Sequence, residues 1–259
     1  MPLETHIGLI EPADENAIIW RFMNLRKFQD LIATQELHFC RADQFLDQTE
    51  GLPPEGHLPS PNLHPLDIRD KREIDALMGS IAQFREAFYI NCWHSFHEET
   101  CQMWKEYGDD GVAICSTYAL LKSALSTLPD KAYLGLVRYG PQPNERWNLF
   151  RFVYHKRIEF KHEQEVRALL WIQDPHAGIN RHFDADNRVY PFPLTPPPAP
   201  VPKGHRRKVD PQSLLTGIVV TPLASSDAFD RIAQAVKSSG LVVPVVPSGL
   251  ARYKDLLPL

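Results

Sequence analysis

Two carboxylates spaced two residues apart, Glu163 and Glu165, are the residues in this sequence best placed to do chemistry together. They open a segment, residues 163–172, whose composition predicts a β-strand. Successive side chains of a strand point to opposite faces, so both carboxylates would enter one cleft while Val166 packs beneath the sheet. Carboxylates that lie this close raise the pKa of one of them, which suits a group that must accept a proton.

Arg21 is the second candidate, because it interrupts the β-branched and aromatic run at residues 17–23. This run predicts a buried strand, and a buried charge requires a partner. The partner is either a ligand or a carboxylate of the protein, so a structural ion pair of Arg21 with Glu163 or Glu165 is an equally good interpretation. The stretch 163–167 also fits the solvated side of an edge strand.

Three separated segments form a recognisable set of motifs. They are Trp20-Arg21-Phe22 followed by Leu37-His38-Phe39, then Cys92-Trp93-His94-Ser95-Phe96 with Met103-Trp104 and Tyr107-Gly108, and finally His162-Glu163-Gln164-Glu165-Val166-Arg167. Together they resemble a widespread bacterial family that is known only as a domain of unknown function and is often met near mobile and defence genes. Because that family has no agreed activity, the resemblance implies no reaction.

The order of Arg21, Ser95 and Glu165 along the chain is also similar to the Arg-Ser-Glu class of ADP-ribosyltransferases. The resemblance implies a split sheet that holds NAD as the substrate, with Arg21 at the phosphates or ribose and Ser95 bracing the site. Glu165 would bond the nicotinamide ribose, and Glu163 would place a macromolecular acceptor, protein or nucleic acid. Breaking the glycosidic bond builds positive charge on the ribose, and a fixed carboxylate stabilises such a transition state.

Two aromatic residues near these motifs, Trp93 and Tyr107, are candidates for the surface on which NAD stacks. Side chains of this kind also form cores, and the core is the commoner place for them. Both interpretations stay open from the sequence.

Four potential metal ligands, Cys92, His94, His97 and Cys101, lie close together in the sequence. Zinc accepts ligands of these types. Their spacing differs from paired zinc knuckles, so we expect no metal here. A basic run at residues 203–208 fits a solvated turn or, less commonly, a contact to phosphate or nucleic acid.

The composition is that of an ordinary globular protein, with 259 residues, 43% hydrophobic residues and a formal net charge of -4. This charge gives no general attraction to nucleic acid. The first 17 residues have no basic start and no apolar run, so we expect no signal peptide and a cytoplasmic protein. Four cysteines in a chain of this length predict free thiols rather than a disulfide framework.

The elements that would position the candidate residues alternate between strands and helices along the chain. Strands are expected at 17–23, 37–40, 88–94, 111–116, 132–139, 163–172, 217–221 and 241–246, and helices at 24–32, 66–85, 99–107, 117–126 and 226–237. This order predicts a single α+β domain over residues 1–259, with a bent or split, mainly antiparallel sheet and flanking helices, like that of ADP-ribosyltransferases. A proline-rich spacer at 191–202 would precede a C-terminal strand-helix-strand unit.

Two functions fit these observations. The first is an ADP-ribosyltransferase-like enzyme that cleaves NAD and modifies a macromolecule, as a toxin, effector or defence component. The second is a non-catalytic module of the same fold that binds a nucleotide or a partner. Convergence of Arg21, Ser95 and Glu165 on one cleft would favour the enzyme.

Overall fold

The computed structural model describes residues 3–53, 81, 84–105, 107, 110–141, 149–172 and 202–251. Its strands are β1 (Ile18–Asn24), β2 (Glu36–Arg41), β3 (Phe88–His94), β4 (Gly111–Thr117), β5 (Ala132–Leu136), β6 (Arg138–Tyr139), β7 (His155–Lys156), β8 (Glu165–Trp171), β9 (Gly204–Lys208), β10 (Gly217–Val220) and β11 (Val245–Pro247). Its helices are α1 (Leu25–Thr34), α3 (Cys101–Lys105), α4 (Tyr118–Ser126), α5 (Leu149–Val153), α6 (Pro211–Leu214) and α7 (Ser226–Ser238), with 3-10 turns η1 (Ala42–Gln44), η2 (Arg85–Ala87) and η4 (Ile158–Glu163).

One large sheet organises the described part of the chain. Its strand order is β11-β10-β4-β1-β3-β2-β9, and β8 pairs with both β3 and β5. These pairings are antiparallel apart from β10 with β11, and a separate two-stranded sheet joins β6 and β7 in parallel. The prediction of a mixed α+β fold with a mainly antiparallel sheet and flanking helices is therefore confirmed.

The sheet divides at β3. One edge of β3 is taken along its whole length by β8. The other edge is shared, because β1 pairs with it only where Trp20 faces His94, while β2 pairs with it through Cys40 and Arg41. The strands β1 and β2 therefore separate alongside the middle of β3, and Arg21 is the first residue of β1 beyond the point of contact.

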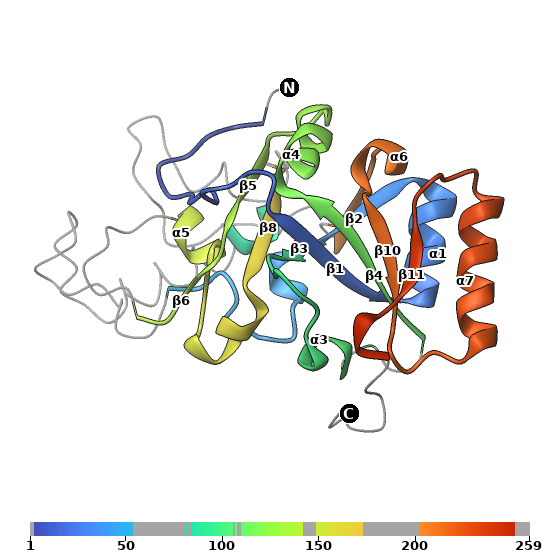
Figure 1. The fold of residues 1–259 in the computed structure, drawn as a ribbon. Helices are drawn as coiled ribbons and strands as arrows, with labels where there is room; N and C mark the ends of the chain where they lie inside the picture. Colours follow the sequence, from blue (N-terminus) through green and yellow to red (C-terminus); the bar gives the residue numbers. More distant parts are fainter. Residues whose placement is uncertain are drawn as a thin grey trace, which may run out of the picture.

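Helices cover the sheet on both faces (Figure 1). One face packs the largest core cluster against α1, α4, α6 and α7, with Phe28, Tyr118, Leu214 and Ile232 among its buried residues. α1 and α7 lie side by side at one end of that layer (Figure 1). The opposite face carries two smaller clusters, one against α3 and one against α5.

Local signals in the sequence set where the helices begin and end. The side chain of Asn24 accepts a hydrogen bond from the Lys27 backbone N–H and so caps the start of α1. At the other end, Gln35 adopts a left-handed conformation with φ 53° and stops the helix. α4 starts in the same way, because the Thr117 side chain accepts from the Leu120 N–H.

Two expectations from the sequence are wrong in detail. The strand predicted at 163–172 starts only at Glu165, because Glu163 ends the 3-10 turn η4 and Gln164 turns the chain with φ 41°. The basic run at 203–208, expected as a solvated turn, forms strand β9 along β2. Cross-strand and neighbouring carboxylates, including Asp30 and Asp130, pair with its arginines.

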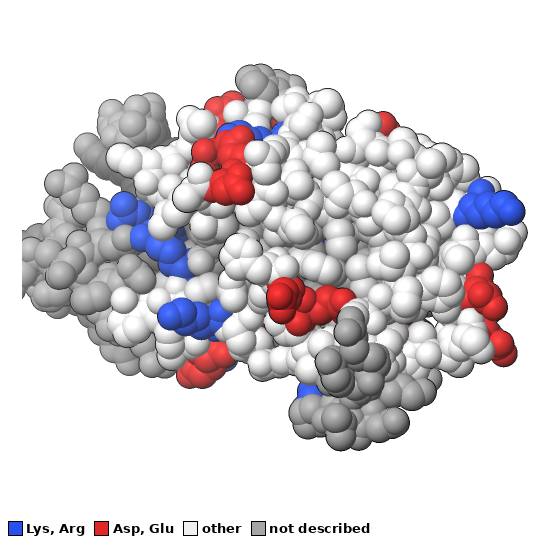
Figure 2. All heavy atoms as spheres, viewed as in Figure 1, with Lys and Arg blue, Asp and Glu red and all other residues white. Residues whose placement is uncertain are grey.

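Other predictions fall almost entirely outside the described residues, namely the helix at 66–85 and the proline-rich spacer at 191–202. Within the described ranges, no helix is long and apolar enough to cross a membrane. On the face shown in Figure 2, charged side chains of the described part form small separate groups of either sign.

Candidate functional site

A buried ionic cluster surrounds Arg167 on the β8 face that carries α5. Its guanidinium is completely enclosed and makes a two-pronged contact with Glu165, from Nε to Oε1 at 2.8 Å and from Nη2 to Oε2 at 2.9 Å. Nη1 donates to Glu50 Oε1 at 2.7 Å and also to the Val153 carbonyl. Two-pronged arginine–carboxylate contacts are among the strongest charge-assisted hydrogen bonds, so this geometry fixes Glu165 firmly.

Lys156 extends the cluster toward the surface. Its Nζ lies 2.6 Å from Glu163 Oε2 and 2.8 Å from Glu165 Oε2, whereas Glu50 Oε2 is 4.0 Å away. The two glutamates therefore do come together, although not as neighbours on one strand face. Lys156 bridges them across the turn that separates η4 from β8.

Burial and charge act in opposite directions on the carboxylates of the cluster. Burial disfavours the charged form of Glu165, but the Arg167 and Lys156 charges outweigh it and hold the pKa of Glu165 well below its usual range. For Glu50, burial dominates, and the charge of Glu165 adds to it, so the pKa of Glu50 is raised. Glu165 is thus held as a carboxylate, while Glu50 takes a proton more readily than Glu165 does.

Backbone contacts hold the entrance to β8 in place. The Glu165 N–H donates to the Tyr139 hydroxyl at 2.7 Å, and the Ser95 N–H donates to the Gln164 carbonyl at 2.8 Å. His94 Nδ1 lies 2.8 Å from the Glu163 carbonyl, and burial lowers the pKa of this histidine. The Nδ1–H of a neutral His94 therefore donates to that carbonyl.

Arg21 is not part of this cluster. Among the residues that the structure describes, its guanidinium has no carboxylate partner, and the proposed ion pair of Arg21 with Glu163 or Glu165 is not formed. The side chain is half-buried, and burial lowers its pKa. A cation withdrawn from water without a counter-charge costs free energy, which an anionic ligand would recover.

Strand alternation alone would send Arg21 to the face opposite Glu165, because Trp20 faces His94 and His94 faces Glu165. However, β1 leaves β3 at this point, and the charge of Arg21 interacts with the Cys92 thiol and the Tyr107 hydroxyl. Cys92 pairs across the sheet with Arg167 and its thiol lies within hydrogen-bonding reach of Glu165. Cys92 therefore stands between Arg21 and the ionic cluster.

The remaining candidates from the sequence have different surroundings. Trp93 is fully buried in the main core, where its indole N–H donates to Asn91 at 2.7 Å, so it offers no stacking surface to a ligand. Tyr107 is partly exposed and stacks on Phe22, with ring centroids 6.1 Å apart. Ser95 is partly exposed just after β3 ends.

Two alternatives from the sequence, an edge strand and a metal site, concern the same segments. The edge-strand interpretation of 163–167 is wrong, since β8 is flanked by β3 and β5 and its charged residues are buried. In the described part of the chain, no group of three or more histidine, cysteine or acidic residues has the geometry of a metal site. Burial also raises the pKa of Cys92 well above its usual value, which opposes the thiolate that zinc needs.

Three members of the cluster were not singled out from the sequence: Glu50, Lys156 and Arg167. Arg167 had a usable signal, because it follows Glu165 by two residues on the same strand and must share its face. Glu50 and Lys156 arrive from distant segments, and no local pattern links them to β8.

No family model and no curated protein matches this chain. Among solved structures, it is similar to Thermus sp. 2.9 DarT in complex with NAD+, with 10% identity and a TM-score of 0.40 over 91% of this chain and 97% of that one. The same protein with carba-NAD+ gives 11% identity and a TM-score of 0.38, covering 91% and 96% of the two chains. Its complex with ADP-ribosylated ssDNA gives 10% identity and a TM-score of 0.39, covering 92% and 96%.

Proposed function

We propose that this chain is an ADP-ribosyltransferase-like enzyme that cleaves NAD and transfers ADP-ribose to a macromolecule. The observation that carries the proposal is the half-buried guanidinium of Arg21, which has no carboxylate partner in the described part of the chain. It lies where β1 leaves β3, and its charge interacts with the Cys92 thiol, which is within hydrogen-bonding reach of Glu165. The pyrophosphate of NAD supplies the anionic oxygens that a guanidinium binds best.

Cleavage of the bond between ribose and nicotinamide requires a carboxylate near the ribose. The bond between ribose C1′ and the nicotinamide nitrogen breaks, its electron pair neutralises the pyridinium ring, and positive charge develops on the ribose. An acceptor atom then donates a pair to C1′ and loses its proton. A fixed negative charge beside the ribose lowers the barrier to the first step.

Glu163 is better placed than Glu165 to meet that charge. The side chain of Glu163 is 17% exposed and, within the described ranges, has Lys156 as its one cationic partner. The side chain of Glu165 is fully enclosed and committed to both Arg167 and Lys156. In this proposal Glu165 is a positioning residue that holds Lys156, and through it Glu163, at the edge of the site.

The enclosure of Glu165 also favours a second candidate function. A module that binds a nucleotide through Arg21 without cleaving it needs no free carboxylate, and the ionic cluster would then serve only stability. Binding of NAD without release of nicotinamide would distinguish this non-catalytic module from the enzyme.

The test compares the wild-type protein with Arg21→Met and Arg26→Met, two identical changes at a half-buried and an exposed arginine. We expect Arg21→Met to weaken NAD binding at least about tenfold, since it removes a charge-assisted contact, and Arg26→Met to leave it unchanged. Nicotinamide release is measured with a cell lysate and with single-stranded DNA as separate acceptor sources. A wild-type protein that neither binds nor cleaves NAD under these conditions would refute the enzyme and favour a module that binds another nucleotide or a partner.

A further inference from the structure

A pocket opens on the surface next to the ionic cluster, in a place that none of the candidate residues from the sequence occupies. Its volume is about 280 Å³, and it is lined by the loop after η1, by the turn after β6 and by the segment from β7 into η4. A pocket of this size accommodates one ring rather than a dinucleotide. Neither Arg21 nor Glu163 lines it.

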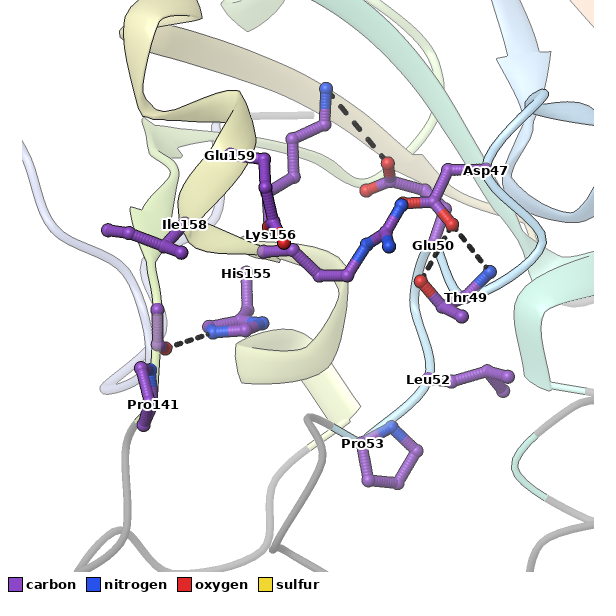
Figure 3. Close-up of a pocket in the computed structure, with 12 residues that line it drawn as sticks. Asp47, Thr49, Glu50, Leu52, Pro53, Pro141, His155, Lys156, Ile158 and Glu159 are labelled. Carbon is purple, nitrogen blue, oxygen red and sulfur yellow. Dashed lines mark hydrogen bonds and ion pairs between the residues drawn. The ribbon is translucent and has the colours of Figure 1, made fainter.

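The walls of the pocket are apolar and face each other. Leu52 and Pro53 lie on one side, and Pro141 and Ile158 lie on the other (Figure 3). Gly140 has a left-handed backbone conformation with φ 78°, and a Cβ at this position would contact Ile158 Cδ1 at 3.4 Å. Two opposed apolar walls of this kind suit a flat ligand.

At the inner end of the pocket, Glu50 has a hydrogen-bond acceptor and Lys156 has a hydrogen-bond donor that no described residue satisfies. Glu50 Oε1 receives the hydrogen bond from Arg167, whereas the partner recorded for Glu50 Oε2 among the described residues is Lys156 Nζ at 4.0 Å, which is too far for a hydrogen bond. Lys156 Nζ directs two of its three N–H groups to Glu163 and Glu165, so one donor remains. The side chains of Glu50 and Lys156 point toward each other in Figure 3.

The charges around the pocket favour a neutral ligand. Arg157 at the rim is paired with Asp47, from Nη2 to Oδ2 at 3.3 Å, and Lys156 is already surrounded by carboxylates. An anion would approach the Glu50 carboxylate, while a cation would approach Lys156. A neutral group that offers an acceptor and a donor side by side satisfies both.

We propose that this pocket binds a small, neutral, flat ring that carries an amide edge, in the ring or attached to it, with the amide C=O accepting from Lys156 and the amide N–H donating to Glu50. An N–H donor at Oε2 would also stabilise the charged form of Glu50, which burial and the neighbouring Glu165 charge disfavour. Two common sources share this chemistry: a nucleobase lactam, and the carboxamide of nicotinamide. The proposal stands apart from the Arg21 site and does not depend on NAD cleavage.

The test uses 1-methyluracil and nicotinamide as probes, each against an analogue without the amide N–H, namely 1,3-dimethyluracil and N,N-dimethylnicotinamide. Binding is measured by calorimetry and by ligand-observed NMR on the full chain. We expect at least one parent amide to bind and its methylated analogue to bind about tenfold or more weakly, because the analogue leaves a buried charged acceptor unpaired. Which parent binds identifies the source.

Two matched variants locate the binding. Leu52→Trp fills the pocket from one wall, and Leu46→Trp makes the same change at a fully exposed leucine in the same loop that does not line it. Neither residue belongs to the ionic cluster, so both variants should keep the wild-type melting temperature. The proposal requires loss of binding in Leu52→Trp alone. It is overturned if neither amide binds, if the methylated analogues bind equally well, or if Leu52→Trp retains affinity.

Discussion

Replacing Glu165 with glutamine should destabilise the fold far more than the same change at Glu163. The variant keeps the shape of the side chain but removes the charge that both Arg167 and Lys156 face. Arg167 would keep Glu50 at 2.7 Å, and Lys156 would keep Glu163 at 2.6 Å. Arg167 and Lys156 would therefore each keep one carboxylate and lose the contact to the charge of Glu165, whose side chain is fully enclosed.

The expected size of the effect follows from burial. Removing one partner of a buried ion pair costs about 3 to 5 kcal/mol, and here both cations lose part of their compensation at once. For a protein of this size, each kcal/mol lowers the melting temperature by about 2 to 4 °C, so we expect a decrease of about 6 to 20 °C. In the described part of the chain Glu163 has a single ionic partner, and its side chain is partly exposed, so Glu163→Gln should cost only about 1 kcal/mol.

The assay is reversible urea unfolding at neutral pH, followed by tryptophan fluorescence and circular dichroism for both variants. The double variant Glu165→Gln with Arg167→Gln should lose less than the sum of the two single changes, since the residues are in direct contact. Similar unfolding free energies for Glu165→Gln and Glu163→Gln, or strict additivity in the double variant, would refute the reasoning.

Three further predictions address the charge at Arg21, acid stability and the start of α1. Arg21→Met should leave the melting temperature unchanged or raise it, because it removes a desolvated cation without a carboxylate partner in the described structure; a decrease of several degrees would contradict this. The pKa of Glu165 lies below its unfolded value of about 4.3, so its stabilising contribution is present above that pH and is lost as pH falls through the folded pKa. Glu165→Gln should therefore show a shallower loss of stability below pH 4.3 in acid unfolding curves. Asn24→Ala should cost about 1 kcal/mol in urea unfolding by removing the α1 cap, and Gln29→Ala, at an exposed position in the same helix, should have no such effect.

Much of the fold was predictable because its elements carry strong local signals. β3 and β4 are apolar runs bounded by polar or glycine residues, and α1 and α4 begin at capping side chains. β9 was missed since a run of basic residues is not typical of a strand. It becomes one through its pairing with β2 and through carboxylates such as Asp130, none of which is local in sequence.

The candidate site was predicted less completely, for a physical reason. The pairing of Glu163 with Glu165 assumed a strand that includes both, but Gln164 takes a left-handed conformation and the chain turns between them. Lys156 of β7 pairs with Glu165, and Glu50 of the loop that follows η1 pairs with Arg167, so these contacts depend on tertiary packing rather than on spacing. Only Arg167 could have been placed by alternation along β8.

Glu165 and Arg21 both interact with Cys92, but they differ in whether their charges are paired within the described structure. On one side, Glu165 has each of its oxygens bonded to Arg167 and one also paired with Lys156. Charges satisfied in this way stabilise the fold and have little left to offer a ligand. On the other side, Arg21 is desolvated and has no carboxylate among the described residues. The described structure gives no reason to keep such a cation, whereas binding an anion does, so a charge without a described carboxylate partner is the stronger indication of function.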